Sequence, residues 1–329
     1  MANLSTKYLG LDLKSPIIVS SSELTNDIEN LKKFEQLGAG AIVLKSLFEE
    51  QITIESRHSQ SYNKRYGFSY PEVEDYISNY SHKNTLAEYI DFLKKAKSEL
   101  TIPVIASINC VSSSEWVSFA REIEKAGADA LELNLFVLPS DPDRFPEDNE
   151  DVYFDLVNNI KRETSLPISL KISTYFSSIA YTIKKLSWTG VSGIVLFNRF
   201  YSPDIDIDNL TINSSAVFSK PEDISTSLKW IAIMSEQVDC DLCSSTGVHD
   251  GTGAIKQLLA GAKAVMICST LYKNGFEQIT AINKQIETWM DSKNFSTIED
   301  FRGKLCANKA ENPAAWERVQ FMKYYSGIE

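Results

Sequence analysis

The chain has 329 residues, of which 43% are hydrophobic and 23% are charged, and its formal net charge at pH 7 is -11. This composition excludes disordered, collagen-like and fibrous proteins, and it supplies enough apolar residues for a large core. The negative charge disfavours nucleic acid as a partner, because phosphate backbones are repelled by an acidic surface.

The N-terminal segment MANLSTKYLG lacks the basic-then-apolar order of a signal peptide, and no apolar window reaches the roughly 20 residues that span a bilayer. We therefore expect a cytoplasmic protein that does not bind membranes. Cys240 and Cys243 are spaced C-x-x-C, but their segment has the pattern of a strand. A strand would send the two side chains to opposite faces, so we expect neither a metal site nor a redox pair there.

Eight apolar segments have the pattern of buried strands. Their runs of Val, Ile, Leu and Ala are typical of parallel strands covered by helices on both faces. They are residues 16–21, 40–46, 103–109, 130–136, 167–173, 193–199, 241–247 and 264–270. Amphipathic patterns with apolar residues three and four apart predict helices at residues 26–38, 85–100, 113–127, 179–190 and 227–238. Gly38, Gly127 and Gly261 each follow a helical pattern and precede a strand, as helix-ending glycines do.

This repetition of strand and helix predicts one (β/α)8 TIM-barrel domain over residues 1–329, with an open doubly wound sheet as the alternative. No G-x-G-x-x-G follows the first strand, so a Rossmann dinucleotide site has no support. The connections after the second, fourth and sixth strands are long, at residues 47–83, 137–149 and 200–220. They would share one rim of a barrel, and we expect the substrate beneath them.

Polar side chains gather where the predicted strands end, and such rim positions are candidates for ligand contact. They are Ser20, Ser21, Lys45, Ser46, Asn109, Asn134, Lys171, Asn198 and Arg199. Lys45 and Lys171 lie within strand patterns, where a buried cation needs a counter-charge or a ligand. The two lysines indicate an anionic or electron-rich ligand. The alternative is that each lysine faces outward or pairs with an acid such as Glu132.

The last two predicted strands end in small residues that lead into helices, which is the usual phosphate site of such barrels. The backbone N–H groups of Gly247, Val248, Ser269 and Thr270 are the candidates to bind phosphate oxygens. The three histidines are scattered, without the spacing of a metal site, and we expect no metal.

The motifs resemble those of the FMN-dependent dihydroorotate dehydrogenases, and among these the soluble class 1A. The similarity begins at LSTKYLGLDLKSPIIVSSS, which resembles the family's N-terminal β-hairpin and first strand. It continues through GAIVLKS, ALELNL, PISLKIS and STGVHDGTGAIKQLLAGAKAVMICSTLYKNG to IEDFRGKL. The resemblance implies pyrimidine biosynthesis, with hydride passing from dihydroorotate to flavin N5. It also implies fumarate or another soluble acceptor, and a homodimer.

The resemblance also assigns roles to the rim residues. It implies that Gly247, Val248, Ser269 and Thr270 hold the FMN phosphate and that Lys171 lies near flavin N1 and O2. Lys45, followed by Ser46, would lie between the flavin and the carboxylate of a small, cyclic, anionic substrate. Ser20 and Ser21 would lie beneath the flavin ring. The side chains that line the flavin and the pyrimidine would be those of Asn109, Asn134 and Asn198.

The chain departs from the family in the loop that carries the catalytic base. The family reads Asn-x-Ser-Cys-Pro-Asn, whereas this chain reads NLFVLPSDPD, with Val137 at the position of the base and Pro139 in place of the second Asn. Ser140 is the nearest hydroxyl, and Asp141 or Asp143 is an alternative base. Arg199 replaces a small hydroxyl residue on the substrate side.

Four hypotheses on function follow. The first is an FMN-dependent oxidoreductase of dihydroorotate, and the second is an FMN enzyme acting on another substrate because the base is missing. The third is a non-redox lyase for phosphorylated sugars that uses Lys171 or Lys45. The fourth is a flavoprotein that binds without turnover.

Overall fold

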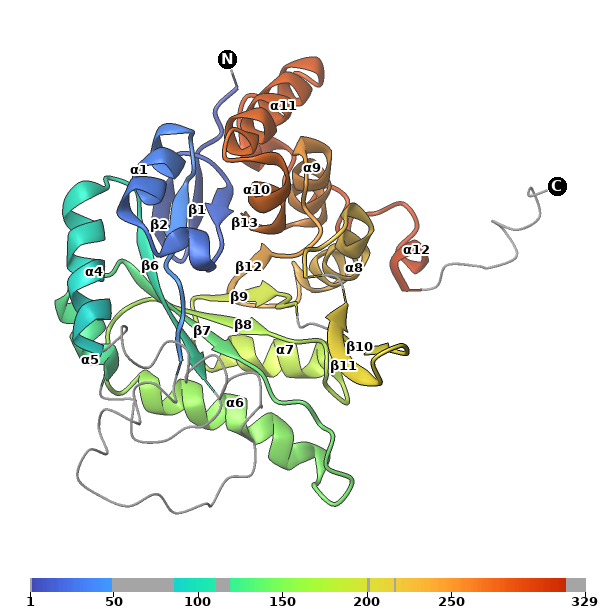
Figure 1. Ribbon diagram of the computed structural model, residues 1–329. Coiled ribbons are helices and arrows are strands. Elements are labelled where there is room, and N and C mark those ends of the chain that lie inside the picture. The colour runs from blue at the N-terminus through green and yellow to red at the C-terminus, as the bar shows by residue number, and fades with distance from the viewer. Residues whose placement is uncertain (1, 49–85, 111–118, 200–201, 216, 318–329) are drawn as a thin grey trace.

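A closed barrel of eight parallel strands lies at the centre of the protein (Figure 1). The computed structural model describes residues 2–48, 86–110, 119–199, 202–215 and 217–317. The barrel strands are β3 (Ile17–Val19), β4 (Ala41–Val43), β6 (Val104–Cys110), β7 (Ala130–Leu135), β8 (Ile168–Ile172), β9 (Gly193–Leu196), β12 (Asp241–Ser244) and β13 (Ala264–Ile267). Pairing of β4 with β6 closes the ring. The predicted (β/α)8 barrel is confirmed, and the open sheet is excluded.

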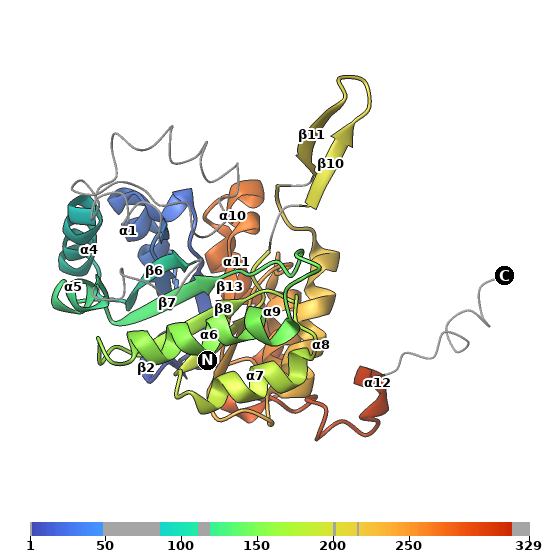
Figure 2. The same ribbon diagram turned by 90° about the horizontal axis from the view of Figure 1, so that it is seen from below.

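Helices surround the barrel, except for the short last helix, which lies outside the ring that the others form (Figures 1 and 2). They are α1 (Ile28–Gln36), α4 (Leu86–Glu99), α5 (Phe119–Lys125), α6 (Pro146–Ile160), α7 (Ile179–Trp188), α8 (Ile224–Met234), α9 (Gly251–Ala260), α10 (Ser269–Asn274), α11 (Gln278–Ser292) and α12 (Ala314–Glu317). Short 3-10 turns are η1 (Glu23–Thr25), η3 (Pro221–Asp223) and η4 (Ile298–Asp300). Gly38, Gly127 and Gly261 have φ of +98°, +91° and +118°, so they end their helices in the left-handed region as predicted.

An N-terminal hairpin closes one end of the barrel. Its strands are β1 (Thr6–Tyr8) and β2 (Leu11–Leu13), and they pair antiparallel. The Tyr8 hydroxyl lies 3.0 Å from Ser169 Oγ near the start of β8, and the Leu9 amide donates to Asp241 Oδ2 at 2.8 Å at the start of β12. The hairpin therefore covers the amino ends of the strands, and a ligand has to enter from the carboxyl ends.

Side chains alternate strictly between the interior of the barrel and its helical coat. Cys243 is fully buried in the interior with Tyr8, whereas Cys240 precedes β12, and both thiols are free. Cys240 thus lies outside the strand that the sequence predicted for both residues. The same alternation places Glu132 and Lys171 inside the barrel, because each follows an interior residue at a spacing of two along its strand.

The three long connections lie at the carboxyl ends of their strands. Most of residues 47–83 lies outside the described residues, apart from β5 (Leu47–Phe48). The connection at 137–149 is an exposed loop that runs into α6. The connection at 200–220 contains a hairpin of β10 (Ser202–Asp206) and β11 (Thr211–Ser215). The sequence analysis predicted no strand in this connection. The hairpin projects away from the barrel (Figure 2). Among the described helices, none is both long and apolar enough to cross a membrane.

Candidate active site

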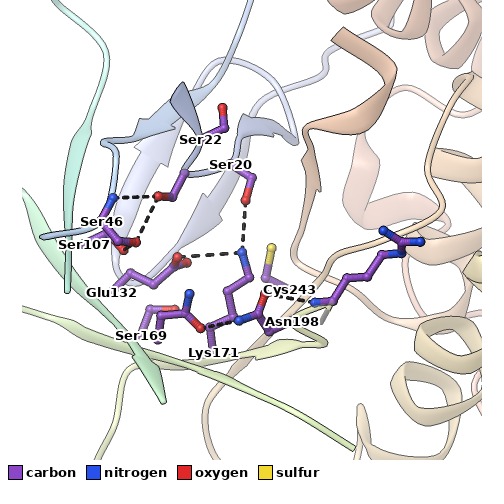
Figure 3. A network of polar contacts seen from close by, with 12 residues as sticks. Ser20, Ser22, Ser46, Ser107, Glu132, Ser169, Lys171, Asn198 and Cys243 are labelled. Carbon is purple, nitrogen blue, oxygen red and sulfur yellow. Dashed lines mark hydrogen bonds and ion pairs between the residues drawn. The ribbon is translucent and has the colours of Figure 1, made fainter. Parts of the chain in front are cut away.

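Lys171 lies inside the barrel near its open end. The side chain is 6% exposed, and Nζ donates to Ser20 Oγ at 3.0 Å. On the other side, Glu132 Oε1 lies 3.9 Å from the same Nζ (Figure 3). Lys171 therefore faces the interior and has Glu132 as its acidic neighbour, which is the alternative that the sequence left open. Its contact with a ligand stays a prediction.

Lys45 follows β4 and is held by an acid that the sequence did not indicate. Its Nζ lies 2.7 Å from Oε1 of Glu23 in the turn η1, and the lysine side chain is 12% exposed. Glu23 is 22 residues earlier in the chain and lies in a short turn, which gives no periodic signal. The ion pair orients the Lys45 ammonium without burying it completely.

Three serines connect the ends of β3, β4 and β6. Ser46 Oγ lies 2.7 Å from Ser107 Oγ and 3.0 Å from Ser21 Oγ, and the Ser46 amide donates to Ser21 Oγ at 2.9 Å. Ser20, which binds Lys171, is the residue next to Ser21. The structure therefore brings Ser20, Ser21, Ser46 and Lys171 together, as the sequence predicted, and adds Ser107, whose inward position on β6 was the available signal.

Asparagines line the mouth above this layer. Asn198 Nδ2 donates to Asn134 Oδ1 at 2.6 Å, and the Arg199 amide donates to Asn198 Oδ1 at 2.9 Å. Asn109 pairs with Asn134 in the register of β6 and β7 and is half-buried. The three predicted amides thus lie at the carboxyl ends of β6, β7 and β9.

A polar cavity of about 330 Å³ lies beside Asn198, between the ends of β8, β9 and β12 and the start of α8. Arg199 lines it: Nη1 donates to the Val217 carbonyl at 2.9 Å, and Nε lies 3.7 Å from Asp223 Oδ2. The guanidinium is therefore already oriented by an acid and a carbonyl. Thr246, with φ of +76°, also lines the cavity. Cβ-branched residues rarely adopt that conformation, so the backbone here is strained.

The predicted phosphate site has backbone amides that are free to bind. Within the described part of the chain, the amides of Gly247, Val248, Ser269 and Thr270 donate to no other residue. Gly247 has φ of +79° and lies against the start of α8, where an added Cβ would be 2.1 Å from the Ile224 nitrogen. Neighbouring side chains are fixed: Ser219 Oγ lies 3.1 Å from His249 Nε2, and the Ser219 amide donates to Ser269 Oγ.

The loop after β7 offers no buried base among its described residues. Ser140, Asp141 and Asp143 are exposed, and Ser140 makes only a backbone contact, through its amide to the Leu138 carbonyl at 2.8 Å. Val137 instead packs against the core, and its amide lies 3.3 Å from the Tyr153 hydroxyl. Apolar residues such as Val137 thus stand where the family has a polar loop. The role of Ser140 as the catalytic base stays a prediction.

Comparison of the sequence with models of protein families assigns the chain to a family. The dihydroorotate dehydrogenase model matches residues 3–290. The chain belongs to the dihydroorotate dehydrogenase family. This membership makes it an oxidoreductase of a family that uses flavin, and it confirms the resemblance to that family.

Curated relatives in the dihydroorotate dehydrogenase family cover almost the whole chain. The catalytic subunit of dihydroorotate dehydrogenase B (NAD(+)) from Thermoplasma volcanium is 26% identical over 322 residues, which is 92% of this chain and 98% of the relative. The same subunit from Thermoplasma acidophilum is 27% identical over 324 residues, with 92% and 99% covered. The subunit from Methanocaldococcus jannaschii is 23% identical over 312 residues, with 91% and 97% covered.

Proposed function

We propose that this protein binds FMN across the open end of the barrel and oxidises or reduces a small, cyclic, anionic substrate at a C–C bond. Bound FMN would supply a hydride acceptor at flavin N5. The observation that carries the proposal is the buried Lys171 ammonium, which donates a hydrogen bond to Ser20 inside the barrel. The chain belongs to a family known for flavin chemistry. A positive charge at this place stabilises negative charge on a reduced flavin.

Two ends of the site fit the proposed cofactor. The free amides of Gly247, Val248, Ser269 and Thr270 would hold the phosphate, because amides without an acceptor bind anions readily. Ser20 and Ser21 are small polar side chains, and Ser20 contacts Lys171, so in this proposal the flavin ring would lie above them. These features support FMN rather than a cofactor without a phosphate.

The substrate would lie among Lys45, Asn109, Asn134, Asn198 and Arg199. Lys45 and Arg199 supply positive charge for a carboxylate, and the asparagines supply donors and acceptors for a ring. The first candidate reaction is dihydroorotate to orotate. The apolar loop at Phe136–Leu138 favours a second candidate, a different substrate whose oxidation needs no base from this loop.

Anaerobic titration of the flavin-loaded protein with dihydroorotate distinguishes the two candidates. Full bleaching of the flavin absorbance supports dihydroorotate as substrate, and no bleaching while dithionite still reduces the flavin supports the second candidate. We expect Ser140→Ala to leave the bleaching rate within about twofold, because the hydroxyl is exposed and unoriented. A fall of about 10²-fold or more would show that Ser140 is the base.

The electron acceptor is also part of the proposal. The sequence resemblance implies fumarate or another soluble acceptor, whereas the relatives are named as catalytic subunits of NAD(+) enzymes. The relatives favour NAD⁺, reached through a second kind of subunit. Mixing the reduced protein with fumarate tests this: we expect no reoxidation by fumarate, and rapid reoxidation by fumarate would overturn NAD⁺ as the acceptor.

We further propose that two copies of the chain associate through the projecting hairpin. Ile205, Ile207, Leu210 and Ile212 are 68%, 79%, 86% and 80% exposed, and Ile205 is paired with Ile212 across the two strands. Asp204 and its cross-strand partner Asn213 point to the other face. An apolar face on a hairpin that projects from the barrel supports a protein contact.

Double substitution Ile205→Ser/Ile212→Ser is expected to weaken self-association by at least about 10²-fold, because burying one isoleucine is worth about 1.5–3 kcal/mol. Light scattering after gel filtration measures the mass. Asp204→Asn, on the opposite face, is the control and keeps the wild-type mass. A wild-type protein with the mass of one chain would refute this contact.

A further inference from the structure

Glu132 is a fully buried acid that the proposed reaction does not yet use. It lies in β7 with 0% exposure and points into the barrel. Neither carboxylate oxygen has a hydrogen-bond partner in the described part of the protein. Buried polar atoms are nearly always paired, so an unpaired carboxylate at the centre of a barrel calls for a specific cause.

The nearby hydroxyl groups form no hydrogen bond with Glu132, because they are hydrogen-bonded to other residues. Ser107 and Ser169 are its register partners on β6 and β8. Ser107 Oγ bonds with Ser46 Oγ, and Ser169 Oγ bonds with the Tyr8 hydroxyl. The neighbours of Glu132 in the strand register are thus committed to other partners.

The charged and titratable groups that face Glu132 and its neighbour Lys171 come from several elements. Lys171 of β8 is 3.9 Å away, and Tyr8 of β1, Tyr89 of α4 and Cys243 of β12 lie within reach of the Glu132 charge. Cys268, which follows β13, lies within reach of Lys171. Lys171 is the one cation in this described set, so it is the group through which Glu132 can act.

The pair has two charge states. Burial raises the pKa of Glu132, and the Lys171 ammonium opposes that rise. When Glu132 is ionised it cancels much of the Lys171 charge, and when it is protonated the full charge of Lys171 is presented to the mouth. The protonation state of Glu132 thus controls the electrostatic potential at the place where the flavin edge would lie.

We propose that Glu132 is a positioning residue that holds the Lys171 ammonium between its carboxylate and the Ser20 hydroxyl and sets how much positive charge Lys171 presents to the flavin (Figure 3). The inference rests on the proposed function, because it gives Glu132 a role toward a bound flavin. It adds a residue that tunes the reduction potential without touching the substrate.

The flavin-loaded Glu132→Gln variant tests the tuning. Glutamine keeps the shape and removes the negative charge, so the reduced flavin gains stability. At a pH high enough for the buried Glu132 to be ionised, we expect the ratio of reduced to oxidised flavin at fixed potential to rise about tenfold in the variant, which is about +30 mV for a two-electron couple. As the pH falls and Glu132 takes up a proton, the wild-type and variant potentials should converge.

Two further variants separate charge from shape. Glu132→Asp keeps the charge, and we expect its potential to lie closer to that of the wild type than to that of Glu132→Gln. Glu277→Gln removes an exposed carboxylate that pairs with Lys33, and it should leave the potential unchanged. Equal potentials for the wild type and Glu132→Gln across the whole pH range would overturn the proposal.

A measurement on the flavin-free protein tests the pair itself. Glu132→Gln leaves Lys171 buried without its counter-charge, so the urea midpoint of unfolding should fall, and Glu132→Gln/Lys171→Met should recover more than half of the loss. Additive effects of the two substitutions would overturn the pairing. If the wild-type protein binds no FMN, the proposed function fails, and this cycle still decides whether Glu132 and Lys171 are coupled.

Discussion

Replacement of Lys171 by methionine is expected to lower the midpoint potential of the bound flavin by roughly 60–90 mV. The reason is electrostatic: a preorganised donor at developing negative charge is worth about 10²–10³-fold, and tenfold is about 30 mV for two electrons. Equilibration with a dye of known potential measures the shift.

The sign of that shift is the informative part. Lys171→Met should lower the potential, whereas Glu132→Gln should raise it, because one removes a positive and the other a negative charge from the same pair. Lys94→Met, which removes an exposed lysine of α4 that pairs with Asp91, is the control and should leave the potential unchanged. An unchanged potential in Lys171→Met would mean that the ammonium does not face the flavin.

Substitution Gly247→Ala is expected to destabilise the protein by about 2–5 kcal/mol and to abolish tight FMN binding. An alanine at φ of +79° is strained by roughly 1–2 kcal/mol. Its methyl group would also meet the Ile224 nitrogen at 2.1 Å, and overpacking of this kind costs about 1–3 kcal/mol. The backbone would have to shift at the place where the amides of Gly247 and Val248 would hold the phosphate.

Gly10→Ala is a matched control for this substitution. Gly10 has almost the same φ, +78°, but no atom lies within 4 Å of its added Cβ. It should therefore show the conformational strain alone, about 1–2 kcal/mol, with FMN affinity intact. Urea unfolding and FMN fluorescence titration measure the two quantities. Equal losses of stability in the two variants would show that the contact of Gly247 with α8 is unimportant.

The barrel was predictable because its signals are local. Each strand is a short apolar run, and each of Gly38, Gly127 and Gly261 stands at a helix end that only a left-handed residue closes. The hairpin of β10 and β11 was missed although alternation of Asp and Ile at residues 204–207 carries the period of a strand. The period covers only four residues of a long connection, and long connections are commonly lids or binding loops.

The site was predictable only in its strand-borne parts. Lys171 and the asparagines stand at fixed places in strand patterns, so the fold brings them together. The pairing of Lys45 with Glu23 depends on a turn, and the unsatisfied carboxylate of Glu132 depends on which partners its serine neighbours choose. Those choices are made by tertiary packing and leave no periodic trace in the sequence.

The absorption spectrum of the purified protein, followed by titration of the flavin-free protein with FMN, tests the central claim most directly. The account predicts a yellow protein that releases FMN on denaturation, rebinds it at a ratio of one per chain, and loses most of this affinity in Gly247→Ala but not in Gly10→Ala. A colourless protein that fails to bind added FMN would contradict the account.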